Sequence, residues 1–184
     1  FAWGGNSGDV NGSGRNYVSW NWKANGTGST DTSGDIDAVV SANQAAGFSI
    51  VTWTGDGGAH TTVPHGLGVA PEIIFEKYRN AAGAWYTWVT AIDGTNDYLI
   101  LNTTAAAGDA GASGTPTSQF FSNWGSANGR TNVAYAFASK PGFSKIGVYT
   151  GNGAADGPMV NTGFKPAWIM IKRTDAVKGW YIRD

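Results

Sequence analysis

The chain has 184 residues, of which only 14% are charged, and its formal net charge at pH 7 is −1. It contains no basic run, which argues against nucleic acid as a partner because phosphate binding needs clustered Lys and Arg. It also contains no Cys, so disulfides, thiol catalysis and zinc sites with Cys ligands are excluded. No apolar run is long enough to span a bilayer, and we therefore expect no membrane insertion.

The remaining composition favours β-structure. The sequence has 28 Gly and 13% aromatic residues, with 9 Trp among them. Gly-rich, small-polar sequences with many turn signals are typical of all-β proteins. The first residues, FAWGGNSG, include neither an initiator Met nor a signal peptide, so we expect a processed or excised piece of a longer polypeptide.

The first expected element is a strand at the end of residues 1–22. Val18, Trp20 and Trp22 alternate there with Ser and Asn, which is the pattern of a half-buried strand. An insert follows at residues 25–46 and begins as a Gly/Ser/Thr loop. Its second half predicts either a short strand or a single helical turn, and we favour extended structure.

Asp31, Asp35 and Asp37 make the insert rich in carboxylate oxygens. Calcium takes about six to eight oxygen ligands, and this stretch has neither EF-hand nor nonapeptide spacing. Asx turns explain the same residues. We therefore expect no cofactor and no metal, with these three residues as weak candidates for a structural calcium ion.

The chain is organised around a stretch that occurs twice, because residues 47–85 recur at residues 142–180. Pro71 matches Pro166 at an offset of 95 (166 − 71), and the TGDG and TGNG turns match at 96 (150 − 54). The pattern predicts equivalent strands in the two copies. They are expected at 48–54, from 73, and at 85–92 in copy one, and at 143–150, 168–172 and 179–183 in copy two.

The region between the copies contains a short buried strand at residues 98–101 and a low-complexity surface loop at 102–118. Residues 121–137 then repeat the N-terminal pattern of Trp-Gly, a polar loop, an Arg and an alternating strand. Copy two stops before its own equivalent of 98–101. Either the N-terminal strand completes its sheet, or neighbouring chains or repeats do.

The duplication predicts the architecture of the whole chain. We expect one compact β unit over residues 1–184, with copy one at about 1–120 and a truncated copy two at about 121–184. The fold class is all-β: an antiparallel sandwich or barrel built from two internally duplicated sheet units, with little helix.

Four polar side chains in copy one are candidates for chemistry. His60 and His65 have no counterpart in copy two and no third ligand nearby, so backbone bonding is the commoner role and ligand or metal binding the alternative. Glu72 and Glu76 lie four residues apart, about 13 Å along a strand, which is too far for a glycosidase pair. We expect them on a charged edge or solvent face.

The aromatic residues are the features most open to a binding role. Aromatics present in both copies are more often core residues than ligand-binding ones. Trp88 matches Arg183 in copy two, and Trp3 and Trp124 lie in loops. These three Trp are therefore the expected surface candidates for stacking on a sugar or a protein partner.

Several segments carry a family likeness, among them YVSWNWKANG, GFSIVTWTGDG, HGLGVAP, YLILN and TGFKPAWIMIKR. They resemble a repeat domain of long virion proteins of tailed bacteriophages, those of marine phages above all. The resemblance covers nearly the whole chain and implies an adhesive or scaffolding role in a virion. It transfers no active site, because its motifs are turns and strands.

The functional expectation is a non-enzymatic structural and adhesive module of a phage virion or similar extracellular assembly, of the fibre or receptor-binding kind. Its expected partners are other copies of itself, other virion proteins, and a cell-surface glycan. Two alternatives stay open: a secreted carbohydrate-binding module, and a purely structural filament or capsid-decoration subunit.

Overall fold

The computed structural model describes residues 10–184, so the candidate Trp3 lies outside the described residues. Every regular element in this part of the chain is a β-strand, which confirms the all-β prediction. The strands are β1 (Ser29–Asp31), β2 (Ala38–Asn43), β3 (Phe48–Thr54), β4 (Thr62–Pro64), β5 (Ile73–Tyr78), β6 (Tyr86–Val89), β7 (Asp97–Ile100), β8 (Gly108–Asp109), β9 (Phe120–Ser122), β10 (Thr131–Phe137), β11 (Ile169–Lys172) and β12 (Trp180–Arg183).

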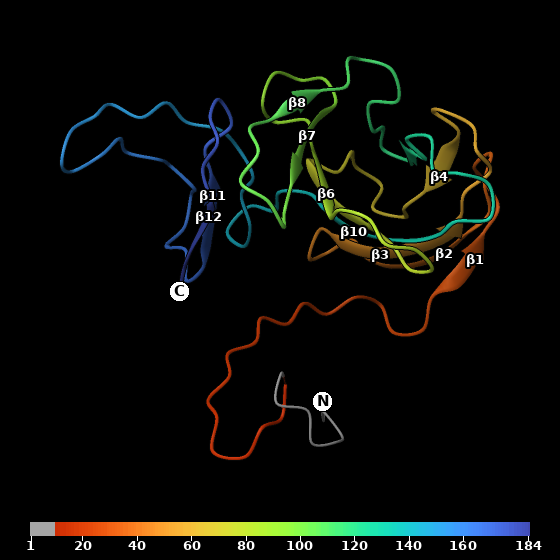
Figure 1. Cartoon of the computed structure of the whole chain (residues 1–184), viewed down its shortest axis with the longest axis horizontal. Helices are drawn as coiled ribbons and strands as arrows, with labels where there is room; N and C mark the ends of the chain where they lie inside the picture. The colour runs from red at the N-terminus through yellow and green to blue at the C-terminus, as the bar shows by residue number, and fades with distance from the viewer. Residues whose placement is uncertain (1–9) are drawn as a thin grey trace.

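Eight of these strands form one antiparallel sheet in the order β1-β2-β3-β10-β5-β6-β7-β8. Figure 1 shows β10 beside β3, although β10 comes much later in the sequence. Strand β10 pairs on one side with β3 and on the other with β5. The boundary expected near residue 120 therefore does not coincide with a boundary of the sheet.

The composition of β10 explains its central place. Ala134 and Ala136 point to the covered face and are fully buried, whereas Val133, Tyr135 and Phe137 are half-buried on the opposite face. Small side chains on one face allow a second layer to approach the middle of the sheet closely. The alternation is therefore that of a strand with one covered face and one half-buried face.

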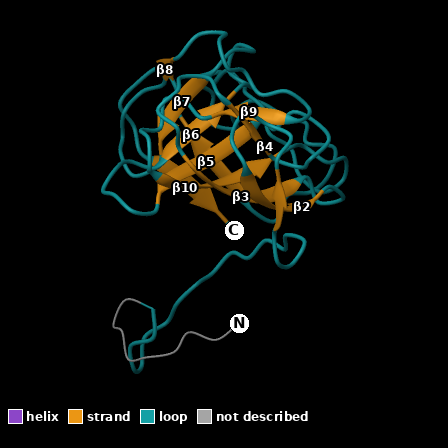
Figure 2. Cartoon of the chain, turned by 90° about the vertical axis from the view of Figure 1, so that its right-hand side faces the viewer, coloured by secondary structure: helices purple, strands orange, loops and turns teal. Residues whose placement is uncertain are grey.

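Strands β4 and β9 form the second layer, which lies over the large sheet (Figure 2). Val63 of β4 and Phe121 of β9 are fully buried and belong to the same hydrophobic core as Val51 and Ile74 of the large sheet. The architecture is therefore sandwich-like and not a closed barrel.

The insert forms strands at one edge of the large sheet. Its second half forms β2, as the preference for extended structure predicted, whereas β1 lies in the half expected to be a loop. Residues 102–118 carry only the two-residue strand β8 and are otherwise irregular, as expected for this composition.

The strands of copy two form only in part. Strands β11 and β12 pair in the register of β5 and β6, since Glu76 lies opposite Tyr86 and Ile171, 95 residues later (171 − 76), lies opposite Tyr181. Two predictions are wrong: residues 143–150 and the alternating residues 17–22 belong to no strand. Residues 143–150 correspond to β3, which pairs with β10, and residues 17–22 correspond to part of β10, which pairs with β3 and β5; neither segment has such a neighbour in the described structure.

Candidate functional site

A pocket of about 270 Å³ opens over strands β5, β6 and β7. Its walls are aromatic apart from one carboxyl group. The lining residues are Glu76, Tyr78, Tyr86, Trp88, Tyr98 and Trp124.

The register of three neighbouring strands brings these side chains together. Glu76 lies opposite Tyr86, and Trp88 lies opposite Tyr98. Side chains two residues apart on a strand share a face, so Tyr78 joins Glu76 on β5, and Tyr86 joins Trp88 on β6. The strand register thus places five of the six lining residues, and Trp124 comes from the loop after β9.

Trp124 closes the pocket from the second layer. It follows β9 with a φ of 43°, in the left-handed region that residues other than Gly rarely adopt. Its ring stacks on Trp88 at a centroid distance of 4.2 Å and an interplanar angle of 11°, and on Phe121 at 5.5 Å and 3°. The left-handed backbone therefore places one indole between the core and the pocket.

Asn123, the residue before Trp124, fixes this turn. Its side chain is fully buried, accepts a hydrogen bond from Trp53 Nε1 at 2.8 Å, and donates to Asp56 and to the carbonyl oxygen of Gly58. A buried amide with all its partners holds the backbone in one conformation. The indole nitrogen of Trp124 itself is buried and has no hydrogen-bond partner in the described structure.

Among the described residues that line the pocket, Glu76 has the only carboxyl group. The residue is 5% exposed, and its Oε2 accepts a hydrogen bond from Trp88 Nε1 at 2.8 Å. Burial raises the pKa of Glu76 to about 7, and the bond from Trp88 offsets this only in part. The prediction of a charged edge or solvent face is therefore wrong for Glu76, because the strand turns this position inward.

The other glutamate serves a different purpose. The Glu72 carboxylate lies just before β5 and accepts a hydrogen bond from the backbone N–H of Ser139. This bond ties the start of β5 to the chain leaving β10. Glu72 takes no part in lining the pocket.

The ring arrangement determines what the pocket can bind. Tyr86, Trp88 and Tyr98 lie within 5.8 Å of one another, centroid to centroid. Aromatic faces around a carboxylate attract an organic cation, through the ring quadrupoles and the charge together. The same faces offer apolar surface to a sugar ring, which leaves both ligand classes chemically compatible with the site.

The two histidines lie away from this pocket. His65 is fully buried, its Nδ1 accepts a bond from the N–H of Leu67, and its Nε2 lies 3.1 Å from the carbonyl oxygen of Thr117. Burial lowers the pKa of His65, and a neutral ring with its proton on Nε2 satisfies both contacts. His60 is exposed in a turn with a φ of 67°.

Two of the three weak calcium candidates, Asp31 and Asp35, accept hydrogen bonds from protein groups. Asp31 accepts bonds from the N–H and hydroxyl of Ser33, and Asp35 accepts bonds from the N–H and hydroxyl of Thr62. The bonds from Thr62 hold the pKa of Asp35 below its usual value. Within residues 10–184 there is no group of three or more His, Cys, Asp or Glu side chains able to hold a metal ion.

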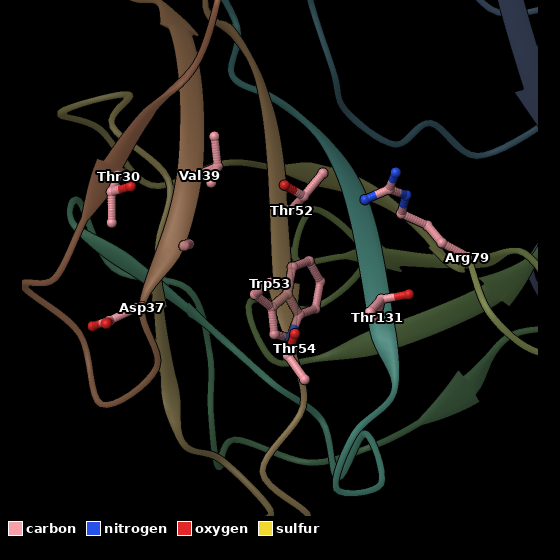
Figure 3. Close-up of a pocket in the computed structure, with 9 residues that line it drawn as sticks. Thr30, Asp37, Val39, Thr52, Trp53, Thr54, Arg79 and Thr131 are labelled. Carbon is pink, nitrogen blue, oxygen red and sulfur yellow. The ribbon is translucent and has the colours of Figure 1, made fainter.

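A second depression, of about 220 Å³, lies on the other face of the sheet (Figure 3). Asp37 and Arg79 lie at its two ends, and Thr52 and Thr131 lie between them. Its polar side chains are exposed or half-exposed, and it holds no buried charge. It is therefore a weaker candidate than the aromatic pocket.

The sequence identified two of the six lining residues, Trp88 and Trp124. It expected both at the surface, but Trp88 is 9% exposed and lies at the boundary of the core. Glu76 was considered only as half of a glycosidase pair and expected on a charged edge or solvent face. The three tyrosines were missed because their common face with Glu76 depends on the register of β5, β6 and β7. One available signal was the difference between copies, since Ile171 replaces Glu76 and Arg183 replaces Trp88 in copy two.

No helix in the described part of the chain has the length and apolar character needed to cross a membrane. The whole chain, residues 1–184, matches the family described as a domain of unknown function, DUF7483, and it belongs to that family. No curated protein and no solved structure matches the sequence.

Proposed function

We propose that this domain is a non-enzymatic binding and structural module of a phage virion or similar extracellular assembly. The observation that carries the proposal is the aromatic pocket with a single buried carboxyl group, Glu76. The virion setting rests on the resemblance of the strand and turn motifs to phage repeat domains. Attachment by such a module gains strength from many weak copies acting together.

The ligand group that fits best is a compact organic cation, such as the ammonium group of an amino sugar or a trimethylammonium group. Glu76 lies in an apolar wall, so a cation that enters would gain charge pairing in a site of low dielectric constant. The rings of Tyr86, Trp88 and Tyr98 add cation–π attraction. A bound cation would also favour the ionised form of Glu76 and lower its pKa.

Three features support a binding role over hydrolysis. Glycoside hydrolysis generally uses two carboxyl groups that face one sugar ring. In the pocket wall Glu76 is accompanied only by aromatic residues, and the Glu72 carboxylate is engaged by Ser139. The same pocket positions in copy two are not acidic, as Ile171 shows.

The test is a titration of intrinsic tryptophan fluorescence with tetramethylammonium, glucosamine and N-acetylglucosamine. Trp88 and Trp124 line the pocket, so occupancy should change the emission. We expect the two cations to bind, and Glu76→Gln to weaken binding by about tenfold or more, as loss of a charge pair in a buried site does. Lys77→Gln, on the opposite face of β5, is the matched control and should leave binding unchanged.

A second candidate, binding of a neutral saccharide, is favoured by the apolar ring surface of Tyr86 and Tyr98 in the pocket wall. It predicts that N-acetylglucosamine binds as tightly as glucosamine and that Glu76→Gln has no effect. Binding of none of the three probes would overturn both ligand classes and favour the purely structural role.

A further inference from the structure

The central strand of the large sheet has a counterpart near the N-terminus. Residues 15–22 repeat residues 130–137 at an offset of 115 (137 − 22), so that Trp22 corresponds to Phe137 and Val18 to Val133. Both segments begin with an Arg and place large side chains at alternate positions. At residues 130–137 this pattern marks β10, the strand that lies between β3 and β5.

The second half of the chain presents the place for such a strand. Strand β11 corresponds to β5 and pairs with β12 on one side only, whereas β5 pairs with β6 and with β10. Residues 143–150 correspond to β3, form no strand, and expose apolar side chains. Phe143 is 59% exposed and Val148 is 58% exposed.

The side chains of the N-terminal segment match this place. Val18 is 66% exposed and Trp20 is 40% exposed. Within one chain, the ring of Trp22 packs edge-on against Trp168 at 5.8 Å and against Phe137 at 5.7 Å. Trp22 corresponds to Phe137, and Trp168 corresponds to Ile73 at the offset of 95 (168 − 73). Phe137 pairs with Ile73 across two strands, so the contact between Trp22 and Trp168 joins two positions that are equivalent to a cross-strand pair.

We propose that residues 15–22 of one chain insert as a complementing strand between residues 143–150 and β11 of a second copy. The order of elements favours a second copy over the same chain. Strand β10 leads directly into residues 143–150, and residues 15–22 lead, through the insert, into β3, the equivalent of residues 143–150. In the sequence, β10 comes after β3 and β5, the two strands between which it lies. Residues 15–22 come after residues 143–150 and β11 only when they belong to the next copy in a head-to-tail arrangement.

This arrangement is heterologous, because one chain gives its N-terminal segment and the other gives its C-terminal half-sheet. Such contacts continue into open chains when they do not close into a ring. Backbone pairing along both edges of the inserted strand would bury the apolar side chains that each region exposes. The aromatic pocket lies outside this contact, so the association and the ligand proposal fail or succeed separately.

Disulfide trapping tests the register. Val133 lies opposite Lys77, so the proposal places Val18 of one copy opposite Lys172 of the other. The chain has no Cys of its own. Chains carrying Val18→Cys are mixed with chains carrying Lys172→Cys under mild oxidation, and the mixed dimer is measured by gel electrophoresis.

We expect the dimer of Val18→Cys with Lys172→Cys to form about tenfold faster than the dimer of Val18→Cys with Ile171→Cys, the matched control. The side chain of residue 171 points to the opposite face of β11, so its sulfur cannot reach the geometry that a disulfide needs. Equal rates for the two partners would overturn the proposal. So would rapid ring closure within a single chain that carries both Val18→Cys and Lys172→Cys.

Light scattering supplies the second measurement, on the full chain. Its mean mass should rise with concentration, and Val18→Pro should abolish the rise because Pro cannot donate to a central ladder. Val10→Pro, upstream of the segment, should leave the rise intact. A mass that stays monomeric at all concentrations, with Cys pairs that do not cross-link, would reject the inserted strand.

Discussion

Residues 25–138 and residues 143–184 carry the same strand motifs in different surroundings. Ile74 is 1% exposed, whereas Ile169, its equivalent 95 residues later (169 − 74), is 41% exposed. The hairpins to which they belong nevertheless share one register. Hairpin register is therefore set by local pattern and turn, whereas burial depends on a distant strand and on the covering layer of β4 and β9.

The two glycines that open the repeat show the same contrast. Gly47 and Gly142 both have positive φ, at 64° and 73°. A Cβ atom on Gly47 would meet the carbonyl oxygen of Ala138 and the side chain of Lys140, whereas one on Gly142 would meet nothing within 4 Å. The same turn is thus crowded where β10 is present and open where it is not.

The largest expected effect comes from a charge on the covered face of the central strand. Ala134→Asp should lower the free energy of unfolding by about 3–5 kcal/mol, because an unpaired carboxylate would be fully buried. Ser19→Asp, at the equivalent exposed position of the N-terminal segment, should change the free energy of unfolding of the folded copy by no more than about 0.5 kcal/mol. Urea denaturation measures both, and equal losses would erase the distinction between the two regions.

The second effect is a dependence of stability on pH. The pKa of Glu76 is about 7 in the folded chain and 4.5 ordinarily, so the folded state holds this proton more tightly than the unfolded state. Its contribution is fully present below about pH 4.5 and is lost as the pH rises to about 7, by about 3 kcal/mol in all. The measured quantity is the difference in unfolding free energy between the native chain and Glu76→Gln at pH 4 and pH 8.

We expect this difference to move by about 3 kcal/mol in favour of the Gln variant as the pH rises. Ile171→Glu supplies the comparison from copy two, since it places a carboxyl group at the equivalent, less buried position. It should change the pH dependence by less than about 1 kcal/mol. A Glu76→Gln difference that is constant with pH would contradict the buried, protonated state of this carboxyl group.

The smallest effect concerns the two glycines. Gly142→Ala should cost about 1 kcal/mol, the usual cost of left-handed backbone for a residue with a Cβ atom. Gly47→Ala should cost about 1 kcal/mol more, because the new methyl group also meets the backbone at Ala138. Thermal unfolding of the two variants provides the comparison, and a larger loss for Gly142→Ala would contradict the difference in crowding.

The sequence predicted the fold class and several of the strands, but not that the N-terminal segment and residues 143–150 form none. Strand β3 has the bounds expected from the alternation of residues 48–54, and β7 lies within one residue of its expected place. Pairing across the chain was not predictable in the same way. Nothing in the alternation of residues 131–137 says that this strand separates β3 from β5, because that choice depends on contacts between distant residues.

The candidate site was predicted less completely than the fold, for the same reason. Trp88 was a candidate because copy two has Arg183 at the equivalent position, but the side chains that form the pocket with it lie mainly on β5 and β7. Glu76 was expected at the surface because charged residues are seldom buried. Only the register of β5 with β6 shows that this position faces Trp88 and shares its wall.

The central place of β10 has a consequence for how the chain folds. Strands β3 and β5 meet only through β10, which pairs Tyr135 with Phe75, 60 residues earlier (135 − 75). During synthesis, β3 and β5 are therefore made before β10, and the edges with which they pair to it stay unpaired until residues 131–137 have been synthesised. Closing such long loops is slow, and open strand edges invite misassembly. The folding rate of this domain is thus expected to be limited by the pairing of β10 with β3 and β5. Until β10 has paired, we expect the chain to need dilute conditions or chaperones to avoid misassembly.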